Sequence, residues 1–379
     1  MNDLTPSPPK RRRGGSLHKW KEIYCGVHGY IYLSPMAQRV VDTVEFQRLN
    51  WLHQLGASFL VFSSASHTRK SHSFGVYHIA RRMAKALQRR HPTIVSDRDI
   101  ELVGLAALLH DIGHFAFSHV GDEVFKGSAS PMKAHEARSI GMLRHMHRKY
   151  GWALTQSEVE TLCQMIHPDA AHAGQWRFQL VSGYVDADRM DYVVRDSANV
   201  GIMTGFGFHH VQHILDHIGI GKHGGLVFDA KVERDVLELL TARSRLHTKV
   251  YQHRVSVAIE QMLVEIFRLL EPVYHFEASL DDPEAFVQFH DGVLMMARSN
   301  PKVPKEAKAL IDRLWTRDFW KVTTSIQENE TRLSRAMYGR WVGMGTGDEH
   351  PMNCLQFEPA IDRYSAPHRA FWISRIVAK

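Results

Sequence analysis

The chain has 379 residues, 44% of them hydrophobic and 23% charged, so it can bury a sizeable core and is too apolar for a disordered protein. It has no apolar run close to the roughly 18–20 residues that a membrane span needs, and its polar, basic N-terminus is unlike a secretory signal. Three widely spaced cysteines form neither a disulfide framework nor a CxxC metal-binding knuckle, which favours an intracellular protein.

The formal charge of +7 is concentrated at the N-terminus. Residues 1–21 hold six basic side chains and one acid, a net +5, so the rest of the chain carries only +2. The basic run at residues 10–13 resembles a weak nuclear-localisation signal or a patch for weak binding of single-stranded nucleic acid. We expect residues 1–20 to form a flexible basic tail and the protein to be in the nucleus or the cytoplasm.

After the tail, apolar residues recur at intervals of three and four, a spacing that predicts amphipathic helices. These helical segments are residues 36–55, 72–90, 99–112, 135–149, 156–167, 176–196, 208–217 and 233–271, with a mostly helical region from 280 to about 340. Short apolar runs around glycines predict a β-hairpin between 218 and 232. A Rossmann sheet would need strands and helices in alternation, which this order lacks, so we expect a mainly α fold with one small hairpin.

The glycines at 219–225 do not form a Walker phosphate loop. Asp216 stands where the first glycine of that motif is required, and His223 follows Lys222 in place of Ser or Thr. A hairpin turn explains this stretch better.

The strongest chemical signal is His110-Asp111 followed by Gly113 and His114. A neutral imidazole and a carboxylate can both bind one divalent metal, but a catalytic site usually has three or four protein ligands. His72 upstream and Asp188 downstream supply the missing groups. This order of a His, a His-Asp pair and an Asp in separate segments resembles the HD phosphohydrolase superfamily.

Helical spacing predicts a cleft beside this motif. Asp188, Tyr192 and Asp196 are four residues apart and share one helical face, and the same spacing relates three residues of a later helix, Arg243, His247 and Tyr251. The alternative is that each stripe faces solvent, as charged residues usually do. The tyrosines within the stripes favour a shared polar cleft.

A phosphohydrolase needs cations for its substrate and an acid for its leaving group. Arg69, Arg189 and Arg243 are candidates for binding phosphate, because a guanidinium can bind it in a bidentate manner. His119, with Asp122 three residues later as its orienting carboxylate, suits the general acid. The alternative for His119 is a helix cap or a structural core histidine.

Several segments in the right order resemble the dNTP triphosphohydrolases typified by the sterile-alpha-motif-and-HD-domain protein. They are residues 46–49 (FQRL), 54–56 (QLG), 65–76 (ASHTRKSHSFGV), 109–119 (LHDIGHFAFSH), 135–136 (HE), 186–192 (DADRMDY) and 246–253 (LHTKVYQH). The resemblance runs from about residue 20 to about 325. With only about twenty residues before it, we expect no sterile-alpha-motif domain.

The resemblance implies an HD-domain catalytic core over residues 21–271 and a helical C-terminal region, 272–379, packed on it. It implies that iron, zinc or manganese is held by His72, His110, Asp111 and Asp188, with magnesium bound to the nucleotide. It also implies that His119, oriented by Asp122, is the general acid. The substrate's phosphates would be surrounded by His114, His135, Arg69, Arg189, Tyr192 and Arg243, and its sugar and base by Gln54, Leu55, Asp196, His247, Tyr251 and Gln252.

The implied reaction converts a dNTP and water into a deoxynucleoside and inorganic triphosphate, which would lower dNTP pools and suggests a role in antiviral defence. Leu55 and the tyrosines, packed around the sugar, would exclude a ribose 2′-hydroxyl. Two alternatives are a nucleotidase or phosphodiesterase of the same superfamily, and a nucleic-acid-binding protein with a vestigial metal site.

Relatives of this kind assemble as oligomers around activating nucleotides, so we expect a dimer or tetramer. The residues that match or nearly match such an activator site are Lys21, Asp42, Gln47, Lys231, His253 and Arg254. Asn50, Gly207, His210 and the run Tyr24-Cys25-Gly26 depart from the family pattern, so guanine-nucleotide activation does not carry over directly. A second metal could be proposed at His209, His213 and His217, but in a chain with 26 histidines such spacing is expected by chance.

Overall fold

The computed structural model describes residues 21–125 and 134–321. The basic tail at 1–20 and the last part of the predicted C-terminal region, from residue 322 onward, lie outside the described residues. Among the residues that are described, no helix is both long and apolar enough to cross a membrane.

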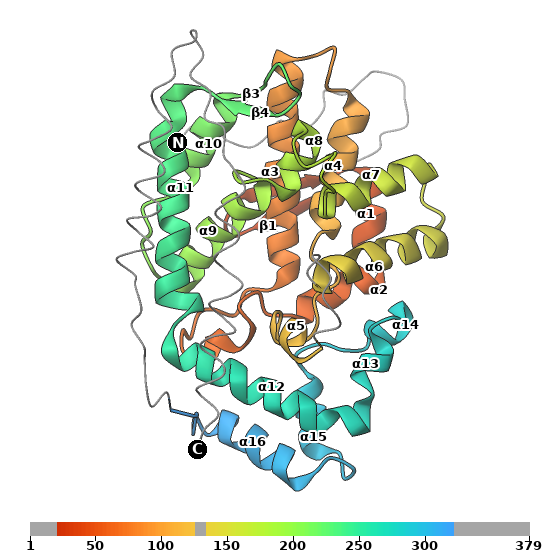
Figure 1. Ribbon diagram of the computed structural model, residues 1–379, viewed down its shortest axis with the longest axis vertical. Helices are drawn as coiled ribbons and strands as arrows, with labels where there is room; N and C mark the ends of the chain where they lie inside the picture. The colour runs from red at the N-terminus through yellow and green to blue at the C-terminus, as the bar shows by residue number, and fades with distance from the viewer. Residues whose placement is uncertain (1–20, 126–133, 322–379) are drawn as a thin grey trace.

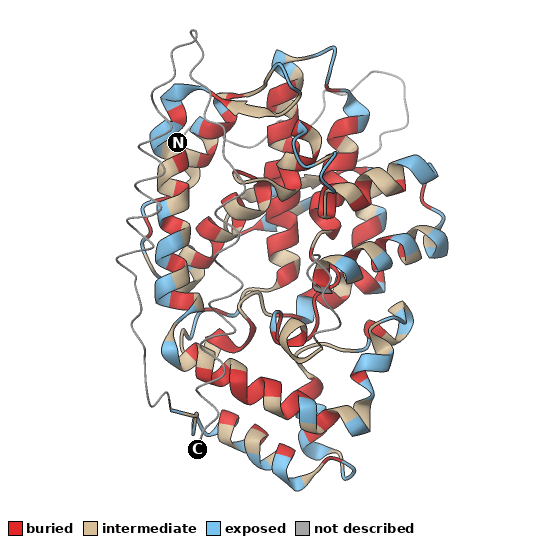
Figure 2. Cartoon of the chain, in the orientation of Figure 1, coloured by how far each residue is buried: buried red, intermediate tan, exposed pale blue. Residues whose placement is uncertain are grey.

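Three helices, α3 (Arg69–Arg90), α4 (Asp97–Leu109) and α9 (Ala187–Val200), form the scaffold of the fold (Figure 1). Helix α3 packs against α4 and against α9. The α3 side chains are buried over most of its length, as Figure 2 shows. Thr68 caps the first turn of α3, and Ser96 with Asp99 forms a capping box at the start of α4, so local sequence fixes where both helices begin.

The other helices surround these three. In chain order their bounds are α1 (Pro35–Val41), α2 (Val44–Gln47), α5 (Val120–Val124), α6 (Ala134–Tyr150), α7 (Gln156–Ile166), α8 (Trp176–Ser182), α10 (Phe208–Asp216), α11 (Glu233–Leu246), α12 (Arg254–Tyr274), α13 (Phe276–Ser279), α14 (Pro283–Phe286), α15 (Val293–Ser299) and α16 (Lys305–Trp315). Short 3-10 turns are η1 (Arg48–Trp51), η2 (Gly56–Leu60) and η3 (Ala230–Val232), and η4 (His247–Tyr251) is a π-helical segment. The prediction of a mainly α fold is confirmed.

The described residues contain two antiparallel hairpins instead of the single one predicted. The predicted hairpin is present as β3 (Ile218–Ile220) paired with β4 (Leu226–Phe228). The additional one joins β1 (Lys21–Cys25) to β2 (Gly29–Leu33). In β2 exposed and buried residues alternate, which is strand periodicity, and Gly29 has the positive φ of 70° that helps to close the turn.

Three predicted helices are wrong as single elements. Residues 176–196 form two helices, because α8 ends at Ser182, Gly183 has an extended backbone, and Asp186 caps the start of α9. Residues 233–271 are divided into α11 and α12 by the π-helical segment η4. Residues 36–55 form only short helices, because α1 ends at Val41 and the Thr43 side chain caps a new start at Val44.

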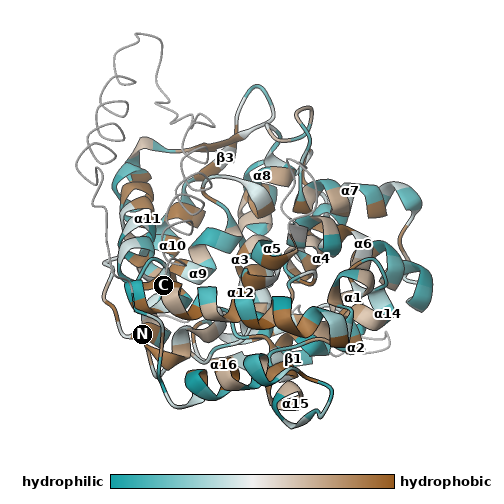
Figure 3. Cartoon of the chain, turned by 60° about the horizontal axis from the view of Figure 1, so that its bottom comes forward, coloured by the Kyte–Doolittle hydropathy of each residue, from teal (hydrophilic) through white to brown (hydrophobic). Residues whose placement is uncertain are grey.

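One hydrophobic cluster spans the described residues and continues past residue 271. Phe115, which follows the His-Asp motif, lies within about 5.5 Å, ring centre to ring centre, of Phe267 in α12 and of Phe276 in α13. Helix α12 also packs against α16, and both show hydrophobic and hydrophilic bands, as expected for helices with one buried face (Figure 3). The aromatic contacts therefore tie the motif to the C-terminal helices.

Gly113, inside the motif, is required by close packing. A Cβ at this position would lie far inside van der Waals contact with backbone atoms of His135, Arg138 and Ser139, which belong to α6. We expect Gly113→Ala to lower the free energy of unfolding by about 1–3 kcal/mol, because backbone atoms cannot move aside cheaply. The measurement is chemical denaturation.

A matched control for that substitution lies on the same helix, α6. Gly141 is exposed, and a methyl group added there would meet only open space, so Gly141→Ala should raise the stability by about 0.5–1 kcal/mol through helix propensity. Equal effects of the two substitutions would contradict the packing argument.

Candidate active site

Three helices bring the predicted metal ligands together. His72 comes from the first turn of α3, His110 and Asp111 follow the end of α4, and Asp188 comes from the first turn of α9. The facing nitrogen and oxygen atoms of His72, His110 and Asp111 lie within 4.8 Å of one another. The Asp188 Oδ1 atom is 3.0 Å from His72 Nε2 and 3.7 Å from His110 Nε2. Three of the predicted ligands thus form a close group, and Asp188 lies beside its two histidines.

The chemistry of this cluster fits a divalent metal. The Nε2 atom of His110 is buried and has no hydrogen-bond partner, which is costly unless a ligand occupies its lone pair. Burial lowers the pKa of His72, but hydrogen bonds with Asp188 and Asp191 outweigh it and raise that pKa to about 10. The carboxylates therefore favour a cation at this point, and a metal ion would take the place of the proton.

A buried carboxylate outside the predicted site supports His72 from behind. Asp191, three residues after Asp188, accepts a hydrogen bond from His72 Nδ1 at 2.8 Å and is bound by Arg195. This contact leaves the Nε2 atom of His72 for the metal side. Asp191 lies within the motif at 186–192, and its position in the same helical turn as Asp188 is the signal that could have identified it.

A second polar cluster lies beside the first. His114, His119, Asp122 and His135 have facing atoms within 4.8 Å of one another. The rings of His114 and His135 stack at 4.0 Å, and His114 Nδ1 is 3.3 Å from Asp111, which therefore borders both clusters. The Nε2 atom of His114 is buried and unpartnered, like that of His110.

Asp122 has more partners than His119 alone, the residue that it was predicted to orient. Its closest contacts are His135 Nδ1 and Arg138 Nη2, each at 2.6 Å, whereas His119 Nδ1 is 3.5 Å away. Burial alone would raise the pKa of Asp122, but its histidine hydrogen bonds keep it well below the usual range. Asp122 is thus an anion shared by two histidines and Arg138, and Arg138 was not anticipated from the sequence.

The second cluster is better suited to an anionic substrate than to a second metal. Asp122, the one carboxylate of the cluster, is already paired with the Arg138 guanidinium and with His135, which leaves little negative charge to attract a second cation. The His119 side chain is 47% exposed and can meet a leaving group at the edge of the cluster.

The two residues directly before His119 form a strained turn. Phe117 and Ser118 both have positive φ values, 56° and 62°, which residues other than glycine rarely adopt. The Ser118 hydroxyl accepts a hydrogen bond from Arg69 Nε and donates one to the carbonyl of His53. Arg69 also pairs with Asp111, so this buried arginine joins the metal cluster to the loop carrying His119.

Asp291, from the C-terminal helical region, fastens the same turn. Its Oδ1 atom accepts a hydrogen bond from the backbone nitrogen of Phe117 at 2.6 Å, and its Oδ2 atom accepts from both the backbone and the ring of His53, at 2.8 and 2.7 Å. The side chain is only 8% exposed. One carboxylate thus fixes the loop before His119 and the loop before Gln54, and no local sequence pattern indicated it.

We expect Asp291→Ala to lower kcat by about 10- to 100-fold while metal content stays unchanged, because small displacements of positioned groups are costly in catalysis. Turnover and bound metal would be measured on the same preparation. Asp281→Ala, at an exposed position ten residues earlier, is the matched control. A loss of metal in Asp291→Ala would contradict a role confined to the two loops.

Of the residues predicted to bind phosphate, Tyr192 and Arg243 contact each other, whereas Arg189 is paired elsewhere. Arg243 Nε donates to the Tyr192 hydroxyl at 2.9 Å, which joins α11 to α9. Burial, opposed by nearby arginines, raises the pKa of Tyr192 to about 12, so the phenol stays protonated. Arg189 pairs with Asp186 in the first turn of α9 and would have to leave that carboxylate to reach a phosphate.

Three of the predicted sugar and base residues lie together around Asp196. Its two oxygens contact Tyr251 Oη at 2.6 Å and His67 Nε2 at 2.7 Å, and the His247 ring lies 4.9 Å from that of Tyr251. His247 and Tyr251 belong to the π-helical segment, a form that is often found at functional sites. His67 was quoted within a motif but given no role.

The other three predicted sugar and base residues differ in their exposure. The Gln54 Oε1 atom is buried without a hydrogen-bond partner, so it is available to a ligand. Leu55, the next residue, is half-buried, and Gln252, which directly follows the π-helical segment, is exposed.

The predicted activator residues lie on several elements. Lys21 Nζ is 3.9 Å from Asp42, and Gln47 accepts a hydrogen bond from Lys70 at 2.7 Å, so these residues share the surface near β1 and α2. Lys231 and Arg254 are exposed, at η3 and at the start of α12, and His253 precedes Arg254.

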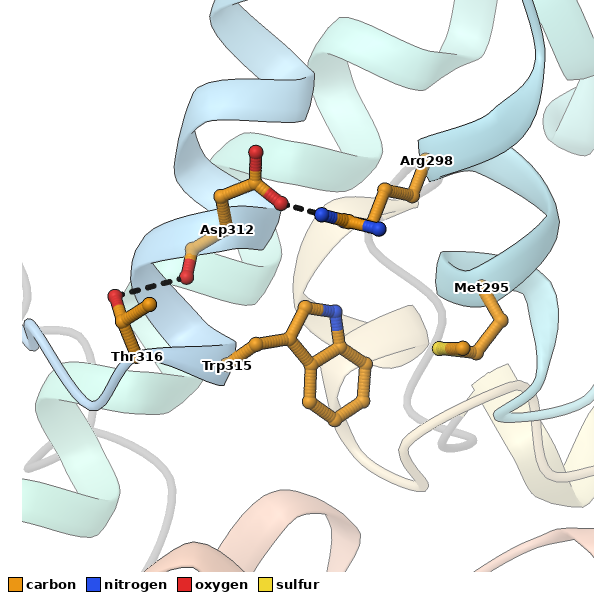
Figure 4. Close-up of a pocket in the computed structure, with 5 residues that line it drawn as sticks. All are labelled: Met295, Arg298, Asp312, Trp315 and Thr316. Atoms are coloured by element: carbon orange, nitrogen blue, oxygen red, sulfur yellow. Dashed lines mark hydrogen bonds and ion pairs between the residues drawn. The ribbon is translucent and has the colours of Figure 1, made fainter.

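Other clusters in the described residues do not compete with this site. An open hollow between α15 and α16 is lined by Met295, Arg298, Asp312, Trp315 and Thr316, with an Arg298–Asp312 ion pair across it (Figure 4). It contains none of the predicted ligands. His209, His213 and His217 are absent from the metal-capable groups found among the described residues, and His213 pairs with Asp235.

A third group, Glu45, His145 and Glu284, is a salt-bridge network. The Lys149 ammonium lies 2.9 Å from Glu45 and 2.7 Å from Glu284, so a cation already occupies its centre.

Comparison with known proteins identifies the family to which the chain belongs. Residues 69–191 match the HD domain family, and residues 211–339 match the HD associated region. A putative HD domain-containing protein, L394, of Acanthamoeba polyphaga mimivirus is 31% identical over 339 residues, covering 80% of this chain and 73% of that protein. The chain belongs to the HD-domain hydrolase family.

Other relatives have a more specific name, deoxynucleoside triphosphate triphosphohydrolase SAMHD1. The protein of Xenopus laevis is 29% identical over 343 residues, 78% of this chain and 54% of its own length. The protein of Homo sapiens is 27% identical over 359 residues, 84% of this chain and 57% of its own length. The chain thus spans little more than half the length of these relatives.

Proposed function

We propose that the chain is a metal-dependent dNTP triphosphohydrolase, which converts a dNTP and water into a deoxynucleoside and inorganic triphosphate. The observation that carries the proposal is the pair of adjoining clusters, joined by the contact between Asp111 and His114. One cluster consists of side chains that could hold a metal, and the other consists of histidines around the Asp122 carboxylate. The similarity to proteins named SAMHD1 supports the choice of substrate.

The four converging side chains His72, His110, Asp111 and Asp188 would hold the metal, for which we propose iron, zinc or manganese, with magnesium accompanying the nucleotide. When bound, such a cation supplies Lewis-acid chemistry, activating water and withdrawing charge from the phosphoryl group. Asp191 orients His72, and Arg69 orients Asp111.

The chain's other groups then bind the triphosphate and complete the reaction. His114 offers its unpartnered Nε2 atom toward the phosphates, with His135, Arg189, Tyr192 and Arg243 around them. His119 donates a proton to the 5′-oxygen that leaves, and Asp122 orients the imidazole. This proton neutralises the negative charge that would otherwise develop on the 5′-oxygen of the departing deoxynucleoside.

The sugar and base would contact Gln54, Leu55, Asp196, His247, Tyr251 and Gln252. The short Tyr251–Asp196 hydrogen bond fixes the tyrosine ring, and a fixed ring leaves little room for an added hydroxyl. We propose that this packing discriminates against ribonucleotides, and that hydrolysis lowers dNTP pools, with antiviral defence as one consequence.

The test is to incubate the protein with each dNTP and, separately, with GTP, in the presence of manganese or magnesium, and to identify products by chromatography. Deoxynucleoside together with triphosphate supports the proposal. Release of phosphate or diphosphate would favour the alternative, a nucleotidase or phosphodiesterase of the HD superfamily. Mixtures of a dNTP with GTP show whether an activating nucleotide is needed.

The wider organisation of the protein belongs to the same proposal. We propose a catalytic core over 21–271 with the following region packed on it, a homo-oligomer, and an activator site that includes Lys21, Asp42, Gln47, Lys231, His253 and Arg254. Size-exclusion chromatography with and without nucleotide tests the assembly. Weak binding of single-stranded nucleic acid would require the basic tail and would weaken with salt.

A further inference from the structure

The turn of the N-terminal hairpin reaches the interior of the active site. His28 lies between β1 and β2, yet its side chain is only 1% exposed. Its ring packs beside His78 of α3 and Phe208 of α10, at 5.3 and 5.2 Å between ring centres. A polar residue in a hairpin turn is normally at the surface, so its burial here points to a particular partner.

That partner is Asp191, the carboxylate behind His72. The His28 Nε2 atom is 2.5 Å from Asp191 Oδ1, while His72 Nδ1 is 2.8 Å from Oδ2. Arg195 donates to both oxygens, at 2.9 and 2.8 Å, so each oxygen of this fully buried carboxylate receives two donors. The angle and position of Asp191 are thereby fixed from three sides.

The surroundings leave Asp191 no alternative position. A Cβ on Gly75 would overlap the Oδ1 atom of Asp191, so the absence of a side chain at Gly75 lets the carboxylate lie directly against α3. The hairpin makes a second contact with the same group, because Arg195 Nη2 lies 3.6 Å from the Cys25 sulfur. The hairpin therefore holds both residues that surround the outer side of His72.

We propose that His28 is a positioning residue for the metal centre: its Nε2–H donates to Asp191 and so fixes the carboxylate that orients His72. The proposal rests on the metal site proposed above. It assigns the hairpin, which precedes the HD domain match at 69–191, a part in setting metal affinity. Partners of a metal-binding histidine typically change affinity by about 10- to 100-fold when they are removed.

Cobalt(II) is the probe, because its visible absorption reports ligand geometry without any nucleotide. His28→Leu removes the donor, and His28→Gln retains an N–H donor on a side chain of similar reach. We expect His28→Leu to bind cobalt at least about tenfold more weakly and with an altered visible spectrum. His28→Gln should restore most of both.

Ile31→Ala is the matched control for damage to the hairpin. Ile31 is fully buried in β2, so its truncation weakens the packing of the hairpin without touching the Asp191 hydrogen bonds. It should lower the melting temperature and leave the cobalt spectrum as in the unmodified protein.

The outcomes separate the possibilities. A normal spectrum and affinity in His28→Leu, the same spectral change in Ile31→Ala, or no rescue by His28→Gln would each overturn the positioning role. Absence of cobalt binding by the unmodified chain would overturn this inference and the proposed metal site together. Failure to hydrolyse dNTPs, with cobalt binding as expected, would contradict only the proposed substrate.

Discussion

Asp111→Asn is expected to remove the bound metal and to lower kcat by on the order of a thousandfold or more, since it takes away both a ligand and a charge at the centre of the reaction. Asp111 lies near His72, His110 and His114 and pairs with Arg69. Burial raises the pKa of Asp111, but His110, His114 and Arg69 outweigh it and keep that pKa well below its usual range, so the native side chain is an anion. Metal content by elemental analysis and turnover would be measured together.

Asparagine is chosen because it preserves the volume of the side chain. Alanine would leave the buried Arg69 guanidinium without its carboxylate, a change that can unfold a protein. Asp169→Asn provides the matched control, because that aspartate is exposed and pairs only locally with His172. If Asp111→Asn retained both metal and turnover, with an unchanged circular dichroism spectrum, the proposed metal site would be wrong.

The central scaffold could be predicted because its signals are local. Helices at 72–90 and 99–112 follow from apolar periodicity, and Thr68 and Ser96 cap their observed starts, within about three residues of the predicted ones. The HD motif predicted four candidate metal ligands, and the structure groups His72, His110 and Asp111, with Asp188 beside two of them. These residues meet because α3 packs against both α4 and α9, which spacing within one helix does not determine, so this part of the prediction depended on the resemblance to a known family.

The supporting residues escaped prediction because they act across long stretches of chain. Asp291 lies 174 residues from Phe117, to which it is hydrogen-bonded, and His28 lies 163 residues from Asp191. Neither belongs to a periodic pattern with its partner. The break at Gly183 and the π-helical segment also escaped, because a 3.6-residue period continues across a short interruption almost unchanged.

His119→Ala is expected to lower the rate of dNTP hydrolysis by about 10²- to 10⁴-fold while leaving metal content intact, because a positioned general acid contributes about that much. The proposed metal ligands form a group that does not include His119, which belongs to the second cluster. A nitrophenyl phosphodiester offers the sharper readout, because its leaving group departs as a stable anion and needs no proton. Its hydrolysis should change little in the variant.

The control for that comparison is His209→Ala, an exposed histidine on α10, which should leave both substrates unaffected. Equal losses on the two substrates in His119→Ala would mean that the imidazole binds phosphate instead of donating a proton. Loss of one equivalent of metal would mean that the second cluster holds an ion, although its carboxylate, Asp122, is paired with Arg138. Selective loss on the dNTP leaves protonation of the 5′-oxygen as the step that requires His119, since only that leaving group is too basic to depart unassisted.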